Sequence, residues 1–196
     1  MARMSGADRR NQIVEAAIDA MLERGVALAA TRDVTRALGV GSGLLHHYFL
    51  SWADLRAEAV RVAAEREIDE VAAMVSALPP RQALTAVADW MVEDDDMRHW
   101  RLWLNALDEA NRDAGLAEVM NAALANWHRL IARLLAGAMG DHAEAPGICD
   151  AAAWRLIALM DGLAGAMLIK GSIVTRDMAR HLIETQMRAE IDVAAG

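Results

Sequence analysis

The sequence predicts an all-α protein with an amino-terminal three-helix helix-turn-helix domain and a carboxy-terminal helical bundle that forms a dimer. Apolar residues recur at helical spacing in every long segment, and no window has the alternation or the β-branched density of a strand. Several segments end at a helix stop, at Gly25, Gly39 and Pro79-Pro80. We therefore expect a first helical domain in residues 1–55 and a second, larger one in residues 56–196.

The amino-terminal domain begins with a helix expected over residues 8–24 and continues with two short helices. After a Thr31 cap, the apolar residues Val34 and Leu38 share one face, and Gly39 ends that helix in the left-handed conformation. Residues 41–49 have room for about two further turns. This arrangement is a helix-turn-helix, whose second helix enters the major groove of DNA.

The second short helix divides its residues between packing and recognition. Leu45, Tyr48 and Phe49 fall at i, i+3 and i+4 and form its apolar face. The other positions face away, where hydroxyl, imidazole and methyl groups can contact base edges or phosphates, as Tyr48 can with its hydroxyl. The predicted DNA-binding residues are Thr31, Arg32, Ser42, Leu44, His46, His47 and Tyr48.

Residues 10–55 resemble the DNA-binding domain of the TetR family of bacterial repressors. Gly39-Val40, Gly43 and His47-Tyr48-Phe49 are most similar to its choline-responsive, BetI-type branch. Farther along, Trp100 and Asp161-Gly162-Leu163 are similar to that branch's ligand and dimer domain. The resemblance implies an operator-binding regulator that responds to a small molecule.

Two positions depart from that resemblance. Gly41 stands where family members commonly have Ser, which weakens the cap of the second short helix. Trp52 stands where they commonly have Lys, which removes a cation that would meet a phosphate.

The segments that follow the helix-turn-helix are also predicted to be helical. Breaks are expected at Asp94–Asp96 and in the loop at residues 140–147. The expected helices cover residues 53–77, 81–93, 97–112, 115–138, 150–170 and 175–193.

Charge and composition narrow the possible functions. The net charge is −8, but residues 1–55 hold six arginines and six acidic residues, so all of the excess negative charge lies in the remainder. DNA affinity must therefore come from a few placed contacts rather than from a basic patch. We expect a cytoplasmic protein without a membrane span, cofactor, metal site or disulfide, since Cys149 is the single cysteine. No catalytic motif supports an enzyme.

Tryptophan and methionine concentrate in the carboxy-terminal part, where five of the six tryptophans lie. Apolar stripes at helical spacing are usually core, and that alternative stays open. Asp161, however, falls within such a stripe, and aromatic faces with a carboxylate suit an organic cation such as a quaternary amine. The predicted effector-binding residues are Trp100, Trp103, Trp127, Trp154 and Asp161; Asp89, Glu93 and Asp108 are alternative counter-charges.

The last two expected helices carry more apolar surface than one chain need cover, which favours a homodimer. The alternative is that this surface closes the chain's own core. Two reading heads would suit a palindromic double-stranded operator. The sequence thus predicts a ligand-responsive transcriptional regulator, most simply a repressor; the alternative is a helical interaction module without DNA binding.

Overall fold

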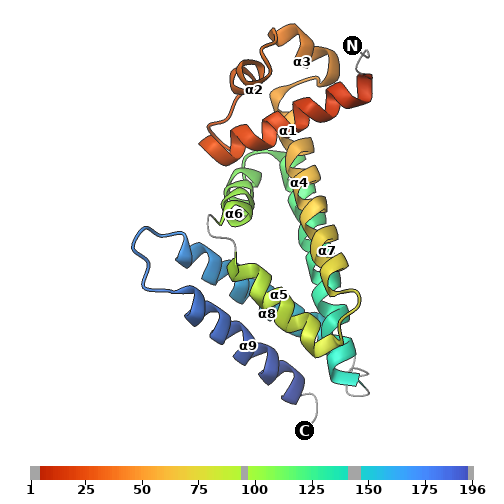
Figure 1. Ribbon diagram of the computed structural model, residues 1–196, viewed down its shortest axis with the longest axis vertical. Helices are drawn as coiled ribbons and strands as arrows, with labels where there is room; N and C mark the ends of the chain where they lie inside the picture. Colours follow the sequence, from red (N-terminus) through yellow and green to blue (C-terminus); the bar gives the residue numbers. More distant parts are fainter. Residues whose placement is uncertain (1–4, 94–96, 141–146, 194–196) are drawn as a thin grey trace. The chain divides into compact units, whose positions relative to one another are not determined.

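The computed structural model describes residues 5–93, 97–140 and 147–193, and within these ranges the secondary structure is helical, with no strand. The breaks expected at Asp94–Asp96 and over most of residues 140–147 lie outside the described residues. The helices are α1 Gly6–Arg24, α2 Thr31–Leu38, α3 Ser42–Tyr48, α4 Trp52–Val75, α5 Pro80–Glu93, α6 Arg98–Ala110, α7 Ala114–Met139, α8 Ile148–Met167 and α9 Arg176–Val193 (Figure 1). The all-α prediction is confirmed.

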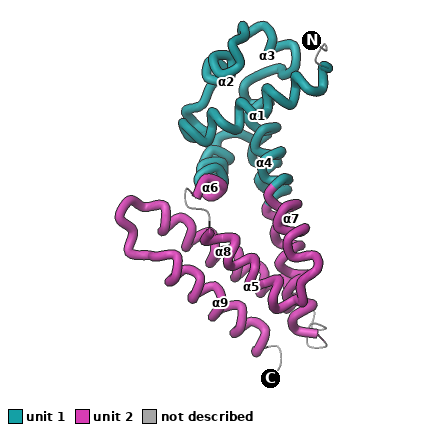
Figure 2. The backbone as a smooth tube through the Cα atoms, in the orientation of Figure 1, with its two compact units in different colours: residues 1–66, 101–123 teal, residues 67–100, 124–196 magenta. Residues whose placement is uncertain are grey.

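The chain forms two compact units (Figure 2). The first unit contains residues 1–66 and 101–123, and the second contains residues 67–100 and 124–196. The helix-turn-helix domain expected in residues 1–55 lies wholly within the first unit. Three helices, α4, α6 and α7, are continuous from one unit into the other.

The first unit is built on α1, which packs on α2, while α2 packs on α3. Ser5 caps α1, because its Oγ accepts a hydrogen bond from the Asp8 amide at 3.1 Å. The helix therefore begins at Gly6, slightly before the expected start. The buried side chains of Ile13, Met21 and Val34 form the core between these helices.

The cap of α2 differs from the expected one. Thr31 is the first residue of the helix rather than its cap, and the Asp33 carboxylate accepts a hydrogen bond from the Ala30 amide at 3.0 Å. Asp33 therefore satisfies a backbone donor that the short helix leaves open. Gly39 ends α2 in the left-handed conformation, with φ 64°, as predicted. Gly41 precedes α3 and supplies no side-chain cap, as its identity implies.

The second unit is a helical bundle in which α9 packs on both α5 and α8 (Figure 1). Its core includes the buried side chains of Leu84, Leu156 and Ile183. The start of α5 lies close against α7, because a Cβ added at Gly137 would lie 2.8 Å from Cγ of Pro80. Only glycine fits at that point without a shift of its neighbour.

Candidate DNA interface and effector site

The recognition helix α3 presents its predicted contact residues to solvent. Ser42, His46 and His47 are exposed, and Leu44 and Tyr48 are half-buried. The rings of His47 and Tyr48 meet edge to face, with 5.1 Å between their centroids. This side of the short helix therefore carries hydroxyl, imidazole and phenol groups that can reach base edges and phosphates.

The opposite side of α3 fixes the helix in place. Leu45 and Phe49 are buried, at 3% and 7% exposed. Arg10 of α1 covers Phe49, with 4.9 Å between the guanidinium Cζ and the ring centroid, which is a cation–π contact. The carboxy-terminal end of α3 is thus held by a residue from the first turns of α1.

Glu58 of α4 holds Arg10 in turn. Its carboxylate lies 2.7 Å from Arg10 Nη1 and 2.8 Å from Arg61 Nε. The hydrogen bond from Arg61, together with Arg10, lowers the pKa of Glu58 from 4.5 to about 2 despite partial burial. Glu58 is therefore ionised throughout the physiological range. Its carboxylate joins α4 to Arg10 of α1, and Arg10 in turn contacts Phe49 at the end of α3.

The amino-terminal end of α2 places the other two predicted contacts. Thr31 is half-buried and Arg32 is exposed at the first two positions of the helix. Asp33 beside them is 8% exposed and lies 3.1 Å from Arg24 Nε at the end of α1. Asp33 was not among the residues predicted to matter here, although an acid at the third helical position is a known capping signal.

Trp52 opens α4, where it is half-buried. Ser51 caps this helix, since the Asp54 amide donates to Ser51 Oγ at 3.1 Å and Ser51 Oγ donates to Asp54 Oδ2 at 2.9 Å. The helix start is therefore well formed, and the indole replaces only the cation that the resemblance implies at this position.

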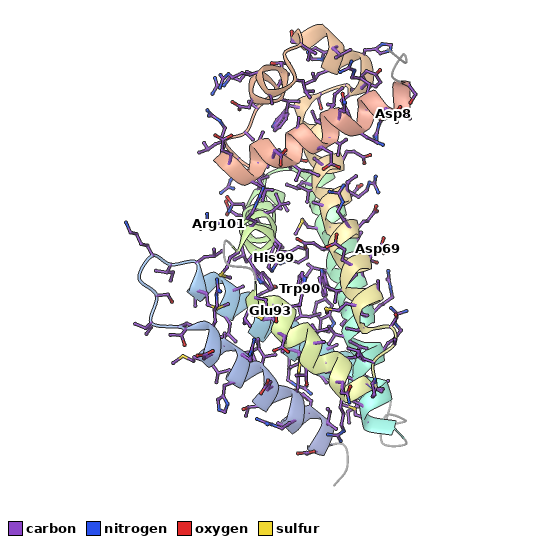
Figure 3. The ribbon with its side chains drawn as sticks, in the orientation of Figure 1. Asp8, Asp69, Trp90, Glu93, His99 and Arg101 are labelled. Atoms are coloured by element: carbon purple, nitrogen blue, oxygen red, sulfur yellow. The ribbon has the colours of Figure 1, made fainter. Side chains whose placement is uncertain are left out.

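A cluster of aromatic rings lies in the second unit, at the end of α5 and the start of α6 (Figure 3). The ring centroids of Trp90 and His99 are 4.7 Å apart, those of Trp90 and Trp127 are 5.3 Å apart, and those of His99 and Trp100 are 5.4 Å apart. Trp100 is buried and its indole N–H donates to the Met91 carbonyl at 3.0 Å. Trp90 and His99 are only half-buried, so part of the cluster is accessible.

This aromatic cluster (Trp90, His99, Trp100 and Trp127) contains two of the predicted effector residues, Trp100 and Trp127. Trp90 is one of the five tryptophans of the carboxy-terminal part but was not among the predicted effector residues. His99 was missed, and its position beside Trp100 was the available indication.

The other predicted effector residues lie elsewhere. Trp103 belongs to the first unit and is 8% exposed, with its indole Nε1 unpaired among the described residues. Trp154 is 48% exposed on α8, where its ring stacks on His128 with 4.6 Å between centroids. Asp161 is half-buried on α8.

The alternative counter-charges differ in their surroundings. Asp89 pairs with Arg180 of α9 at 3.1 Å, and Asp108 pairs with Arg112 at 2.9 Å. Glu93 is exposed one helical turn beyond Trp90 on α5 and forms no ion pair with the described residues. Of these three acids, Glu93 is the one that a cation on the aromatic cluster could engage without breaking an existing pair.

Helices α8 and α9 expose large apolar side chains. Arg155 of α8 donates two hydrogen bonds to buried Glu190 of α9, from Nε to Oε1 at 2.6 Å and from Nη2 to Oε2 at 2.5 Å. These hydrogen bonds lower the pKa of Glu190. The exposed large apolar residues are Trp154 on α8, Ile169 and Ile173 in the connection between the two helices, and Met178 and Leu182 on α9.

Among the described residues, no three His, Cys, Asp or Glu side chains are grouped so that they could hold a metal ion. In the same part of the chain, no helix combines the length and the apolarity needed to cross a membrane.

An exposed recognition helix on a helix-turn-helix scaffold, followed by a helical bundle, defines a DNA-binding transcriptional regulator. The model of the family "Bacterial regulatory proteins, tetR family" matches residues 13–59, and the model "BetI-type transcriptional repressor, C-terminal" matches residues 80–192. The chain belongs to the TetR family, with a carboxy-terminal domain of the BetI type. Both models describe transcriptional regulators rather than enzymes, which decides against the interaction module without DNA binding.

Curated relatives agree with this assignment. The chain is 27% identical over 179 residues to the regulator PksA of Bacillus subtilis, covering 89% of this chain and 86% of the relative. It is 28% identical over 188 residues to the regulator BetI of Rhizobium meliloti, covering 93% of this chain and 89% of the relative.

Solved structures share the fold. A transcriptional regulator from Pseudomonas aeruginosa PAO1 superposes with a TM-score of 0.82 at 20% identity, covering 99% of this chain and 94% of the other. A regulator from Saccharomonospora viridis, solved in complex with choline, superposes with a TM-score of 0.80 at 22% identity, covering 93% and 96%.

Proposed function

We propose that this protein is a repressor that binds a palindromic operator as a homodimer and leaves it when a small organic cation binds the aromatic cluster. The observation that carries the proposal is the grouping of Trp90, His99, Trp100 and Trp127 with part of the cluster accessible. Aromatic faces attract quaternary and other alkylated amines through their quadrupoles. The regulator from Saccharomonospora viridis with the same fold was solved in complex with choline, which supports this choice of ligand.

A carboxylate completes the proposed site. A cation that leaves water loses hydration energy, and each aromatic face returns only about 0.5 to 2 kcal/mol. An acid must therefore contribute, and Glu93 and Asp161 are the two candidates, the first by its position on α5 and the second by its place in the apolar stripe of α8. Trp103 and Trp154 stay in the proposal as predicted contacts.

The outer face of α8 and α9 supports the homodimer. Five exposed large apolar residues on these helices and their connection would meet a second copy across a two-fold axis. Two recognition helices spaced by roughly 34 Å would then fit successive major grooves, and the bound cation would favour dimers with a different spacing. Such a regulator acts in the cytoplasm, on chromosomal DNA.

The test is binding of the full chain to DNA fragments from its own promoter region, measured by fluorescence anisotropy with and without choline. We expect a salt-dependent complex with one dimer per fragment, which choline dissociates. Failure to bind any fragment at low salt would refute the DNA-binding proposal. Stable operator binding that no amine weakens would refute only the cationic effector.

A further inference from the structure

A second charged contact of α4 lies in the first unit, apart from the recognition helix and the aromatic cluster. Arg56 is buried, and its Nη1 lies 2.8 Å from Glu109 Oε1 while its Nη2 lies 2.5 Å from Asp113 Oδ2. Glu109 is in the last turn of α6, and Asp113 immediately precedes α7. One buried arginine thus holds both sides of the connection between these helices.

The contact is strong for its position. All three side chains are 11 to 14% exposed, so little water screens them. The hydrogen bond from Arg56 lowers the pKa of Asp113, although burial opposes this. Asp113 also accepts a hydrogen bond from the Leu116 amide at 3.1 Å, which caps α7. Loss of Arg56 alone would leave two buried carboxylates without their cation, a costly state.

Arg56 lies two residues before Glu58, and the two side chains bind different helices. Arg56 holds the connection between α6 and α7, whereas Glu58 holds Arg10, which covers Phe49 at the end of α3. Because Arg56 and Glu58 are two residues apart, both contacts lie within one turn of α4. A displacement of the connection between α6 and α7 therefore acts on the turn of α4 that also carries Glu58. Glu58 holds Arg10, and Arg10 covers the end of the recognition helix.

The same segment touches the DNA-binding domain at another place. A Cβ added at Gly25, the stop of α1, would lie 3.2 Å from Asn105 Oδ1 of α6. Residues 101–123 also cluster with residues 1–66 as one compact unit (Figure 2). We call residues 101–123 the α6–α7 corner.

We infer that Arg56 is a positioning residue that makes the α6–α7 corner part of the DNA-reading body. This inference rests on the proposed function for its consequence in regulation. Helices α6 and α7 continue from the corner to Trp100 and Trp127 of the aromatic cluster. A change at that cluster reaches the recognition helix through the corner while Arg56 holds Glu109 and Asp113.

The test uses the full chain and a charge-neutral variant, Arg56→Met/Glu109→Gln/Asp113→Asn, which removes the ion pairs without stranding a buried charge. Asn at position 113 can still cap α7. The matched control is Arg112→Met, because Arg112 is an exposed arginine of the same corner that pairs with Asp108 and Glu109 but not with α4.

Hydrogen exchange of the free protein gives the first readout. In the wild type and in Arg112→Met, we expect amides of the corner and of α1 to open together, with the same dependence on low concentrations of urea. In the charge-neutral variant, the corner should exchange about tenfold faster while α1 keeps its protection. Unchanged exchange at the corner in that variant overturns the inference, whether or not the chain binds DNA.

Operator binding gives the second readout. When the recognition helix binds its operator, we expect the amides of the corner to exchange more slowly in the wild type and in the control. In the charge-neutral variant, operator binding should not slow their exchange. Equal protection in all three proteins overturns the coupling. If no fragment of DNA binds, the proposed function fails, and the free-protein exchange alone decides whether Arg56 joins the corner to α1 and α4.

Discussion

The guanidinium of Arg10 lies over the ring of Phe49, 4.9 Å from its centroid, so a residue of α1 closes the end of the recognition helix. Arg10→Met should weaken operator binding about tenfold, because the end of α3 loses its fixed position. The slope of affinity against salt should stay unchanged if Arg10 only positions Phe49. Fluorescence anisotropy at several salt concentrations measures both quantities.

A double-mutant cycle supplies the control for that prediction. Phe49→Leu should also weaken binding, and the two changes together should cost less than their sum, because they remove one shared contact. A shallower salt slope in Arg10→Met would instead mean that Arg10 contacts a phosphate directly.

His47 and Tyr48 are two of the predicted DNA contacts of α3, and their rings touch each other edge to face. Replacing both with Ala should abolish sequence-specific operator binding while the protein stays folded, since Leu45 and Phe49 still anchor the helix. Footprinting measures the first effect, and circular dichroism with size-exclusion chromatography measures the second. An unchanged footprint would remove α3 from the account of recognition.

Trp52→Lys should tighten operator binding and make the salt dependence steeper by about two counterions per dimer, because each subunit neutralises one more phosphate. The start of α4 should tolerate the change, because Ser51 and Asp54 form the cap. Binding isotherms at several salt concentrations provide the measurement. A constant slope would mean that this position does not face the DNA backbone.

The aromatic cluster should account for amine binding. Trp127→Ala and Trp90→Ala should each weaken choline binding about tenfold or more in calorimetry, since each removes a cation–π face. Choline binding should release heat and raise the melting temperature. Glu93→Gln and Asp161→Asn are compared in parallel, and the counter-charge is the acid whose neutralisation abolishes both effects. Clear binding of a fatty acid or a neutral aromatic compound, with no heat from amines, would contradict the cationic effector.

Glu58 should contribute stability that depends on pH. Its pKa of about 2 in the folded chain lies below the ordinary 4.5, so its ion pairs stabilise the fold fully above about pH 4.5 and lose that effect as the pH falls toward about 2. Glu58→Gln should therefore lower the free energy of unfolding by a constant amount from about pH 7 to pH 5, and by less at about pH 3.5. Urea unfolding at each pH measures the difference.

Glu65→Gln is the matched control for that series, because Glu65 also pairs with Arg61 but is half exposed. Its effect should be small at every pH. A difference for Glu58→Gln that does not narrow at low pH would show that its carboxylate is not the stabilising group.

The helix-turn-helix could be predicted because its information is local. Val34, Leu38 and Gly39 define α2 within eight residues, and Leu45 and Phe49 define the buried side of α3. The Asp33 cap was equally local and was overlooked in favour of Thr31. Elements of this kind follow from spacing alone.

The long-range ion pairs could not be predicted in the same way. Arg56 meets Glu109 and Asp113 across 53 and 57 residues, and one sequence with 48 charged residues does not say which charges meet. The aromatic cluster was predicted in part for a related reason. Tryptophans in a helical stripe look alike whether they pack in a core, as Trp100 does, or lie at a surface, as Trp154 does.

The balance of charge in the DNA-binding domain affects how the protein binds DNA outside its operator. Residues 1–55 carry no net charge, and three of their arginines, Arg10, Arg24 and Arg36, are engaged by the acids Glu58 and Asp33. Affinity for random DNA comes mainly from free cations, and a chromosome offers roughly a million or more competing sites. We expect a domain of this kind to bind these competing sites weakly. In the proposed mechanism, a small number of molecules per cell would then keep an operator occupied, because few of them are held at competing sites.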